Sequence, residues 1–508
     1  MGKKSEQKKK ITPGAVCLIA ALVLLYSPFF NMYTISNYTG DTMIQVRIGL
    51  DTLSQKHLIL QDIYSWHEGL GWYPHETGWC ILAGIAYKLL GVMGVIGLVA
   101  VIVYVIAGLS FKSDYKNGIH PFIILLNAAV ARYLSFPSYI ARPGIFSQLF
   151  IALFLFIVLS EKDIRIKSGS FVLFAFLISW IHGGMTPALF LIILIIILIE
   201  ALFKAWKNCL WYLGSVIIGF CSSLLNPIGF GVWRYALMQS QGAEVWDMIE
   251  EWDPKIFSIP EMALILLLLI GFAVNDKIRR FDKNTIIKLA MFLMFLIASC
   301  KYCRFMNFVA LMIIMFGAEQ FSCLISWLNE HLFRIPEDTI SIGRTSYYII
   351  SVFCAAFFAF NLITSLVRFF PTNSMSDISA LAAYDEGVID VIKDKGYKKI
   401  YNDFNSGTWL AFYGVPVHID NRVDPYLSEF SGQDYIRGKM TINSVEGMNG
   451  FVDEYHPDAV VLEFPPDFAG YLIDEFEADG RYTLVYDNTL TSSYDDTTIR
   501  WLVFEVIY

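Results

Sequence analysis

Charged residues are scarce in this chain of 508 residues. Asp, Glu, Lys and Arg make up 17% of it, whereas soluble domains carry about 25%. Hydrophobic residues reach 56%, and the mean hydropathy is +0.52. Runs such as residues 189–203 have no continuous polar face, which is typical of segments in lipid. The composition excludes a disordered chain and an ordinary cytosolic enzyme, and it predicts a polytopic membrane protein.

Several other features are missing. No cysteine occurs after Cys354, which excludes a disulfide framework for the last part of the chain. Neither a G-x-G-x-x-G fingerprint nor a Walker motif is present, so nothing in the sequence supports a nucleotide site. We also find no internal repeat of the kind common in transporters.

The charge is unevenly distributed. Residues 372–508 contain 24 acidic and 9 basic residues, whereas residues 1–371 contain 22 acidic and 29 basic residues. Hydropathy falls at the same point. We therefore predict a multi-pass membrane domain over 1–371 and a soluble acidic domain over 372–508. A nucleic-acid partner is excluded for so acidic a domain, because phosphate binding requires the opposite charge.

The apolar runs predict eleven membrane-spanning helices. A twelfth would arise if 77–90 crossed separately, but we expect this segment to be interfacial or re-entrant. With eleven spans, 19 basic residues fall on the side of the N-terminus and 7 on the other side. The positive-inside rule then predicts a cytoplasmic N-terminus and an extracytoplasmic C-terminal domain in a cell-membrane protein. The expected spans are 14–30, 91–110, 119–136, 144–160, 169–183, 184–203, 210–226, 261–275, 285–300, 304–326 and 346–369.

The acidic domain shows both helical and strand-like patterns. Short runs rich in β-branched and aromatic residues predict strands near 398–404, 415–421, 458–464 and 483–488. Amphipathic segments predict helices over 387–396 and 467–480. The expected fold is therefore an all-α membrane domain. A small extracytoplasmic α/β domain follows it and can fold alone in water.

Polar residues gather at the outer ends of the expected spans. Ionisable groups at membrane depth are costly and usually line a cavity or site. Each residue type also has a structural interpretation. An Arg side chain can extend to the membrane surface, a His can hydrogen-bond the free backbone groups at a helix break, and Asn-Pro can cap a helix. The candidates are His75, Glu76, Arg142, His182, Asn226, Glu251 and Arg304.

The first outer loop, 31–76, contains the main candidate base. Asp41 follows the first apolar run directly and precedes an amphipathic stretch that begins at Met43. Partial desolvation of a carboxylate at a membrane surface tends to raise its pKa, as a general base requires. Alternatively, Gly40-Asp41-Thr42 simply starts the next helix, with Asp41 as a cap.

The pattern of these residues resembles the membrane glycosyltransferases of the GT-C fold, which carry a catalytic Asp early in a large first outer loop. More closely, it resembles a group of bacterial multi-pass proteins within that superfamily. The second acid common at the first-loop motif is absent, because Thr42 follows Asp41. The matching segments are Asp41-x5-Arg47-x-Gly49, His75-Glu76-x-x-Trp79, Arg142-Pro143, His182-Gly183, Asn226-Pro227-x-Gly229, Glu251-Trp252, Asn402-x4-Gly407-x-Trp409 and the run from His418 to Tyr426.

This resemblance implies an enzyme that moves a sugar from a polyprenyl-phosphate carrier to an extracytoplasmic glycan or lipid acceptor. Asp41 would be the base, assisted by His75 and Glu76. Arg142, Arg304 and His182 would contact the donor phosphate. Other polar residues have acceptor-binding or structural roles, namely Asn226, Glu251, Asp420, Arg422 and Asp424.

Two other functions fit the same features: a transporter or flippase of lipid-linked glycans, and a non-catalytic scaffold of envelope assembly. The long polar first loop and the outer domain favour chemistry on one face over transport. No metal motif is present. Asp41, Glu76 and Glu251 could join around a divalent cation, but nothing in the sequence requires one. The cofactor thus stays open, and the sugar and the acceptor are not specified.

Overall fold

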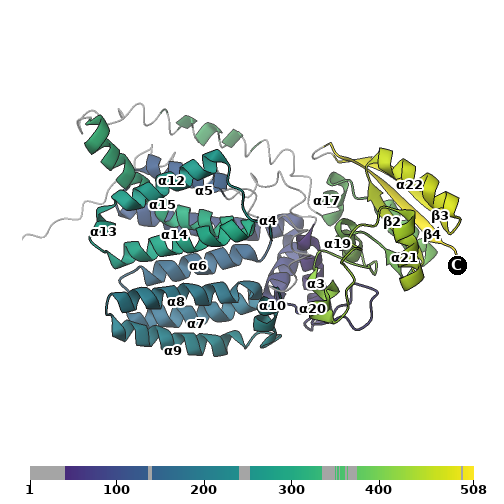
Figure 1. Ribbon diagram of the computed structural model, residues 1–508, viewed down its shortest axis with the longest axis horizontal. Coiled ribbons are helices and arrows are strands. Elements are labelled where there is room, and N and C mark those ends of the chain that lie inside the picture. The colour runs from purple at the N-terminus through teal and green to yellow at the C-terminus, as the bar shows by residue number, and fades with distance from the viewer. Residues whose placement is uncertain are drawn as a thin grey trace, which may run out of the picture.

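The computed structural model describes residues 40–134, 140–239, 252–334, 374–492 and 496–508, with isolated positions between 349 and 363. Long helices lie side by side in one half of the molecule, and the C-terminal sheet with its helices forms the other half (Figure 1). Helix α3 (Asp41–Gln55) lies between the halves. The first expected span, 14–30, and most of the last, 346–369, lie outside the described residues.

The helical half is built from apolar helices, some of which start at a polar cap. Asp163 accepts a hydrogen bond from the Arg165 amide at the start of α7, and Ser258 and Glu261 form a capping box on α12. The long helices are α4 (Thr77–Lys116), α5 (Pro121–Leu134), α6 (Gly144–Val158), α7 (Ile164–Ile181), α8 (Thr186–Leu202), α9 (Trp206–Ser223), α12 (Ile259–Val274), α14 (Lys283–Lys301) and α15 (Met306–Leu328). The shorter α10 (Gly231–Gln239) and α13 (Asp276–Arg279) complete this half.

The expected number of eleven spans is not met by the described residues. Five helical segments are long and apolar enough to cross a membrane: Thr77–Lys116, Ile164–Ile181, Gly183–Leu202, Lys283–Lys301 and Cys303–Phe333. Helices α5, α6 and α12 are apolar but have only 14, 15 and 16 residues, and a span needs about 20. The difference has several causes. Helices α5 and α6 are shorter than the apolar runs that suggested them, α12 has only 16 residues, and α9 is long enough but not apolar enough. The expected spans 14–30 and most of 346–369 lie outside the described residues.

Segments 77–90 and 91–110, which we expected to be separate, belong to the single helix α4. The helix is interrupted where we had divided it: Leu90 and Gly91 have non-helical backbone angles, and Gly91 has φ +62°. Glycine adopts this left-handed conformation at little cost. A kink, rather than a loop, therefore separates the two parts.

Helices α3 and α4 cross at unusually close range because glycines face each other. A Cβ atom on Gly49 would lie 1.9 Å from the Cys80 carbonyl oxygen, and one on Gly84 would lie 2.6 Å from the Gly49 carbonyl carbon. Neither helix backbone can accommodate such a contact without moving. This packing fixes the position of the first residue of α3, Asp41.

We expect Gly84→Ala to separate α3 from α4, because the new methyl group meets backbone rather than a flexible side chain. The cost of such overpacking is about 1–3 kcal/mol, so the unfolding temperature of the purified protein should drop by several degrees. Gly97→Ala on the same helix is the control, since a Cβ atom there meets nothing within 4 Å. Equal unfolding temperatures for the two variants would contradict the close crossing.

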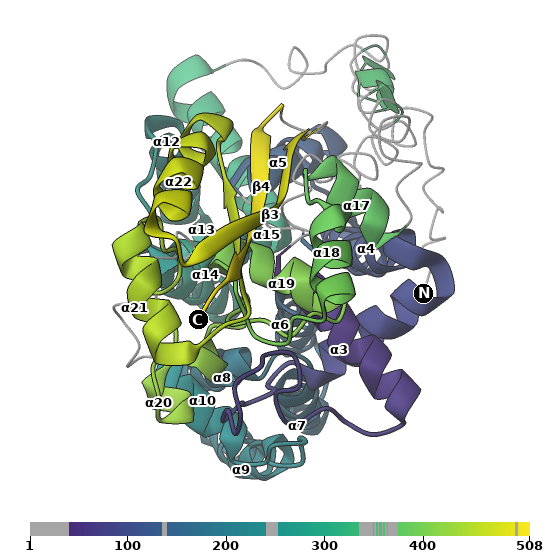
Figure 2. The same cartoon turned by 90° about the vertical axis from the view of Figure 1, so that its right-hand side faces the viewer.

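The C-terminal half contains one four-stranded sheet in the order β1-β2-β4-β3. Strand β1 (Ile400–Tyr401) is parallel to β2 (Ala459–Phe464), and β4 (Thr498–Val506) is antiparallel to both β2 and β3 (Tyr482–Thr491). Helices α21 (Val445–Tyr455) and α22 (Pro466–Asp479) cover one face. Helices α17 (Met375–Leu381), α18 (Glu386–Lys395) and α19 (Phe404–Phe412) lie on the other side (Figure 2). Strand alternation produces these layers: Val460 and Leu462 face α21 and α22, whereas Ala459 and Val461 face the opposite side.

The expected helices at 387–396 and 467–480 and the expected strands at 458–464 and 483–488 correspond to α18, α22, β2 and β3. Only two residues of the expected 398–404 strand are extended. The expected 415–421 strand is wrong: Val417 makes only an isolated bridge, with Ser65 of the first loop. Strand β4 and helices α19 and α21 were not predicted.

The first loop is part of the C-terminal fold. The Trp66 amide donates to the Val417 carbonyl, the Val417 amide donates to the Tyr64 carbonyl, and the Trp66 indole donates to the Ile400 carbonyl at 2.8 Å. On α3, Arg47 Nη1 donates to the Phe412 carbonyl at 2.6 Å. Part of the packing of the C-terminal half therefore comes from the first loop, and the independent folding of residues 372–508 stays a prediction.

Two acids in this half lie side by side, a buried Asp403 and a half-buried Glu463. Asp403 caps α19 by accepting from the Ser406 amide and hydroxyl, and it is hydrogen-bonded to Glu463 of β2. Burial raises the pKa of Asp403 to about 6. Burial and the neighbouring Asp403 charge hold the pKa of Glu463 well above its usual range. The pair therefore holds a proton near neutral pH.

A raised pKa in the folded state means that the pair is most favourable at low pH and loses stability as the pH rises through about 6. We expect Glu463→Gln to raise the unfolding temperature by a few degrees above about pH 7, because the amide keeps a hydrogen bond and removes the second charge. Glu477→Gln, at an exposed position of α22, should leave the pH dependence unchanged. A Glu463→Gln variant that follows the wild-type pH dependence would refute the shared proton.

Candidate active site

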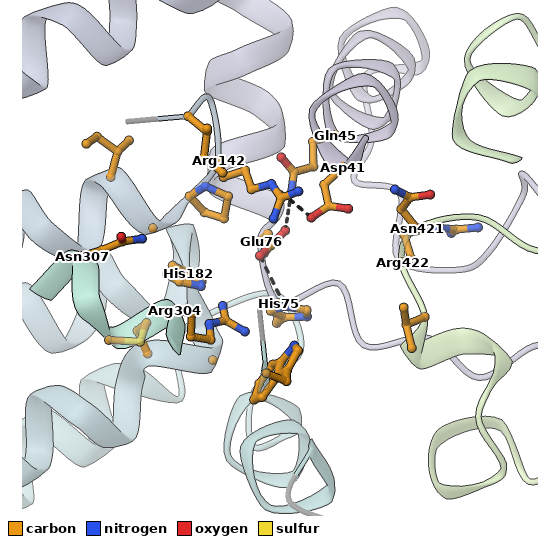
Figure 3. A pocket seen from close by; sticks show the side chains of 18 of the residues that line it. Asp41, Gln45, His75, Glu76, Arg142, His182, Arg304, Asn307, Asn421 and Arg422 are labelled. Atoms are coloured by element: carbon orange, nitrogen blue, oxygen red, sulfur yellow. Dashed lines mark hydrogen bonds and ion pairs between the residues drawn. The ribbon is translucent and has the colours of Figure 1, made fainter. Parts of the chain in front are cut away.

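A cavity of about 730 Å³ lies where the helical half, the first loop and the C-terminal half meet. Its wall combines residues that are far apart in the sequence, and Figure 3 shows their side chains converging on one space. The charged and polar residues around it are Asp41, Gln45, His75, Glu76, Arg142, His182, Lys255, Glu261, Arg304, Asn307, Asn421, Arg422 and Asp424.

Asp41 stands at the first position of α3, and Gly40 occupies the cap position. The alternative interpretation is met in part, because α3 does start at Asp41 and carries its charge in the first turn, although Gly40 rather than Asp41 occupies the cap position. The Asp41 Oδ2 atom lies 3.4 Å from Arg142 Nε. The Arg142 guanidinium points at Asp41 across the cavity mouth (Figure 3). The pair places one positive and one negative charge at the same point of the wall.

His75 and Glu76 form a second pair, directly before α4. His75 Nε2 lies 3.5 Å from Glu76 Oε1, and Gln45 Nε2 donates to Glu76 Oε2 at 2.7 Å. Burial would raise the pKa of Glu76, but the hydrogen bond and charge of His75 outweigh it and lower that pKa to about 2. Burial would lower the pKa of His75, but Glu76 raises it on balance. The pair therefore favours the charged form of each partner.

Further along the wall, Arg304 and His182 come from breaks between helices. His182 ends α7 and is 7% exposed, and its Nδ1 lies 2.8 Å from the Ser147 hydroxyl. The Arg304 guanidinium lies 4.4 Å from the centre of the Trp252 ring. Within the part of the chain that the structure describes, Arg304 has no carboxylate partner. It therefore presents its charge to the cavity.

The C-terminal half closes the opposite side. Asn421 and Arg422 approach from the side away from His182, Arg304 and Asn307 (Figure 3). Arg422 Nη2 lies 2.6 Å from both Asp62 Oδ1 and Asp420 Oδ2. Burial would lower the pKa of Arg422, but these two carboxylates hold it well above its usual range. Arg422 thus joins the first loop to the C-terminal half at the cavity wall.

Comparison with solved structures finds a similar fold in the Archaeoglobus fulgidus oligosaccharyltransferase, in a crystal structure of that enzyme tethered by a disulfide bond to an acceptor peptide containing the NVT sequon. The TM-score is 0.50 at 13% identity, and the match covers 96% of this chain and 74% of that chain. The fold is similar to that of a membrane glycosyltransferase. No protein-family model matches the chain, and no curated protein matches it.

Eight of the eleven sequence candidates line the cavity: Asp41, His75, Glu76, Arg142, His182, Arg304, Arg422 and Asp424. Glu251 lies outside the described residues. Asn226 does not line the cavity: its amide donates to the Ser223 and Gly229 carbonyls, and its oxygen accepts from the Ile228 amide. Asn226 therefore holds a turn. Asp420 is fully buried and pairs with Arg422 and Tyr426, so its contacts are structural.

Sequence reasoning missed several residues of the wall. Gln45 is four residues after Asp41 and therefore shares its helix face; this spacing could have indicated it. Lys255 and Glu261, 2.9 Å apart, and Tyr235, which stacks on His75 with ring centres 3.7 Å apart, carry no comparable signal. Their positions follow from tertiary contacts alone.

The described residues contain no group of three His, Cys, Asp or Glu side chains that could hold a metal ion. Glu76 is already engaged by His75 and Gln45, and Asp41 by Arg142. The open possibility that Asp41, Glu76 and Glu251 join around a cation stays untested, because Glu251 lies outside the described residues.

Proposed function

We propose that this protein is a membrane glycosyltransferase that moves a sugar from a polyprenyl-phosphate carrier to an extracytoplasmic glycan or lipid acceptor. The observation that carries the proposal is the pair of arginines in one cavity together with carboxylates. Arg304 has no carboxylate partner among the described residues, and the Nε atom of Arg142 lies 3.4 Å from Asp41 Oδ2 at the wall of the same cavity. Guanidinium groups in this arrangement suit phosphate oxygens.

The transfer follows from this arrangement of charges. Arg142 and Arg304 hold the donor phosphate, and His182 lies beside them. As the bond between sugar C1 and the phosphate oxygen breaks, the lipid phosphate leaves with the electron pair and the arginines stabilise its charge. Positive charge develops on the sugar ring, as in related glycosyl chemistry. The carboxylate of Asp41 stabilises that charge and orients Arg142.

The test uses the purified full-length protein in lipid nanodiscs with a panel of undecaprenyl-phosphate monosaccharides (glucose, galactose, mannose and arabinose). Membranes of the source cells supply the acceptor, and donor consumption is followed. We expect the wild type to consume one donor. Arg304→Gln should weaken binding of undecaprenyl phosphate about 10- to 100-fold, the value of a hydrogen bond to a charged group.

Arg165→Gln is the matched control, because Arg165 also lies over a tryptophan ring, Trp211 at 5.6 Å, but away from the cavity. It should bind undecaprenyl phosphate as the wild type does. Absence of both donor consumption and undecaprenyl phosphate binding in the wild type would overturn the proposal. Movement of the lipid-linked sugar across the membrane without its consumption would point to a flippase instead.

A further inference from the structure

The turn that begins at Asn421 carries a strained backbone at the cavity wall. Val423 has φ +55° and ψ −59°, and the Asp424 amide donates to the Arg422 carbonyl at 2.5 Å. These are the features of a γ-turn of the rare, strained type. A β-branched residue at positive φ is a genuine outlier, and such strain persists only where the surroundings impose it. The buried contacts of Arg422 with Asp62 and Asp420 supply that constraint.

The same turn presents three polar atoms that have no hydrogen-bond partner within the described residues: Asn421 Oδ1, Arg422 Nη1 and Asp424 Oδ2. All three residues line the cavity, and Asp424 is only 3% exposed. Buried polar atoms are nearly always paired, and each exception requires an explanation. Two acceptors and one donor on one wall match a ligand rich in hydroxyl groups, since each hydroxyl both donates and accepts.

We infer that the 421–424 turn is the binding site of the acceptor hydroxyl, and that Asp424 is the general base that removes its proton. This inference rests on the proposed function. The acceptor oxygen forms the new bond to sugar C1 while the bond from C1 to the phosphate oxygen breaks. The hydroxyl proton passes to Asp424 Oδ2, and the phosphate leaves as an anion held by Arg142 and Arg304.

The other carboxylates of the cavity are less suitable bases. Asp41 is paired with Arg142, and both oxygens of Glu76 are engaged, one by Gln45 and one by His75. Asp424, a residue of the cavity wall, keeps one buried carboxylate oxygen without a hydrogen-bond partner among the described residues. The donor phosphate therefore binds on the side of the helical half, and the acceptor binds on the side of the C-terminal half.

The surroundings of Asp424 suit a base at neutral pH. Burial raises its pKa to about 7, while the charges of His75 and Arg422 act to lower it and that of Glu76 acts to raise it. Tyr235, on α10, is the other titratable group whose charge is coupled to Asp424. A general base is most effective when its pKa lies near the working pH. Because the base must be unprotonated, transfer should slow as the pH falls below about 7.

The experiment compares wild type, Asp424→Asn and Asp424→Glu in nanodiscs, with the donor that the wild type consumes. Asp424→Asn should lower transfer about 10²- to 10⁴-fold and lose the acidic limb of the pH profile. The Asp424→Asn variant should bind undecaprenyl phosphate as tightly as the wild type does. Asp424→Glu should keep measurable transfer with an acidic limb. The control Asp467→Asn, at an exposed position of α22, should behave as the wild type.

Infrared difference spectroscopy in the carbonyl region of protonated carboxyl groups provides a readout independent of turnover. A band that titrates near pH 7 in the wild type should vanish in Asp424→Asn. If Asp424→Asn fails to fold, Asn421→Ala replaces it and should raise the acceptor KM without changing binding of undecaprenyl phosphate. An active Asp424→Asn with the wild-type pH profile, or an Asn421→Ala with wild-type acceptor KM, overturns the inference but not the proposed function. A wild type that consumes no donor and binds no undecaprenyl phosphate overturns both.

Discussion

Asp41→Asn is expected to lower sugar transfer by about 10²- to 10³-fold, the usual effect of removing one preorganised electrostatic contact from a transition state. The amide keeps the size of the side chain but loses the negative charge that faces Arg142 at 3.4 Å. Gly40, not Asp41, holds the cap position of α3, so the stability lost at the helix start is limited to about 0.3–1 kcal/mol from the charge in the first turn. Expression and unfolding temperature should therefore stay near the wild-type values, and donor consumption in nanodiscs measures the effect.

The control is Asp276→Asn. Asp276 is also the first residue of its helix, α13, but its side chain is 74% exposed and lies away from the cavity. This variant tests whether losing the charge of an acid at a helix start is by itself enough to disturb folding. Asp41→Asn should also retain the acidic limb of the pH profile, since that limb is assigned to Asp424. Transfer at the wild-type rate by Asp41→Asn would rule out a role for this charge, and Glu76 would be the next candidate.

Arg422→Gln is expected to destabilise the full-length protein strongly. The guanidinium lies between Asp62 and Asp420 and is nearly buried, with 6% of the side chain exposed. It also faces the rings of Trp72 and Tyr64, 5.0 and 5.2 Å from their centres. Removing one partner leaves two buried carboxylates uncompensated, which costs about 3–5 kcal/mol. Thermal unfolding in detergent, followed by intrinsic fluorescence, should show a large drop.

Arg481→Gln offers a close comparison, because Arg481 also pairs with two carboxylates, Asp453 and Asp479, but on the surface. Exposed ion pairs contribute little to stability, so this variant should unfold near the wild-type temperature. Similar unfolding temperatures for Arg422→Gln and Arg481→Gln would show that the buried contacts do not hold the first loop to the C-terminal half. The cavity wall at Asn421 and Asp424 would then need another support.

The sequence by itself determined the broad class of the protein and many of its elements. Apolar runs without a polar face predict helices in lipid, and the strand-like runs at 458–464 and 483–488 correspond to β2 and β3. Such patterns are local, because the periodicity of a helix or strand depends on its own side chains. Polar residues at the ends of apolar runs were also recognisable, since burying them requires a reason. Six of these candidates lie around one cavity: Asp41, His75, Glu76, Arg142, His182 and Arg304.

Only the tertiary structure decided how those residues work together. The sequence does not show that residues 64–66 pair with Val417, that Asp62 holds Arg422, or that Gly49 and Gly84 let α3 lie directly on α4. It suggested Asp41 as the base, assisted by Glu76, and gave Asp424 an acceptor-binding or structural role. The structure instead pairs Asp41 and Glu76, and it leaves one oxygen of Asp424 without a hydrogen-bond partner among the described residues. Pairing, burial and pKa depend on which groups the fold brings together from distant segments, and no local pattern encodes that proximity.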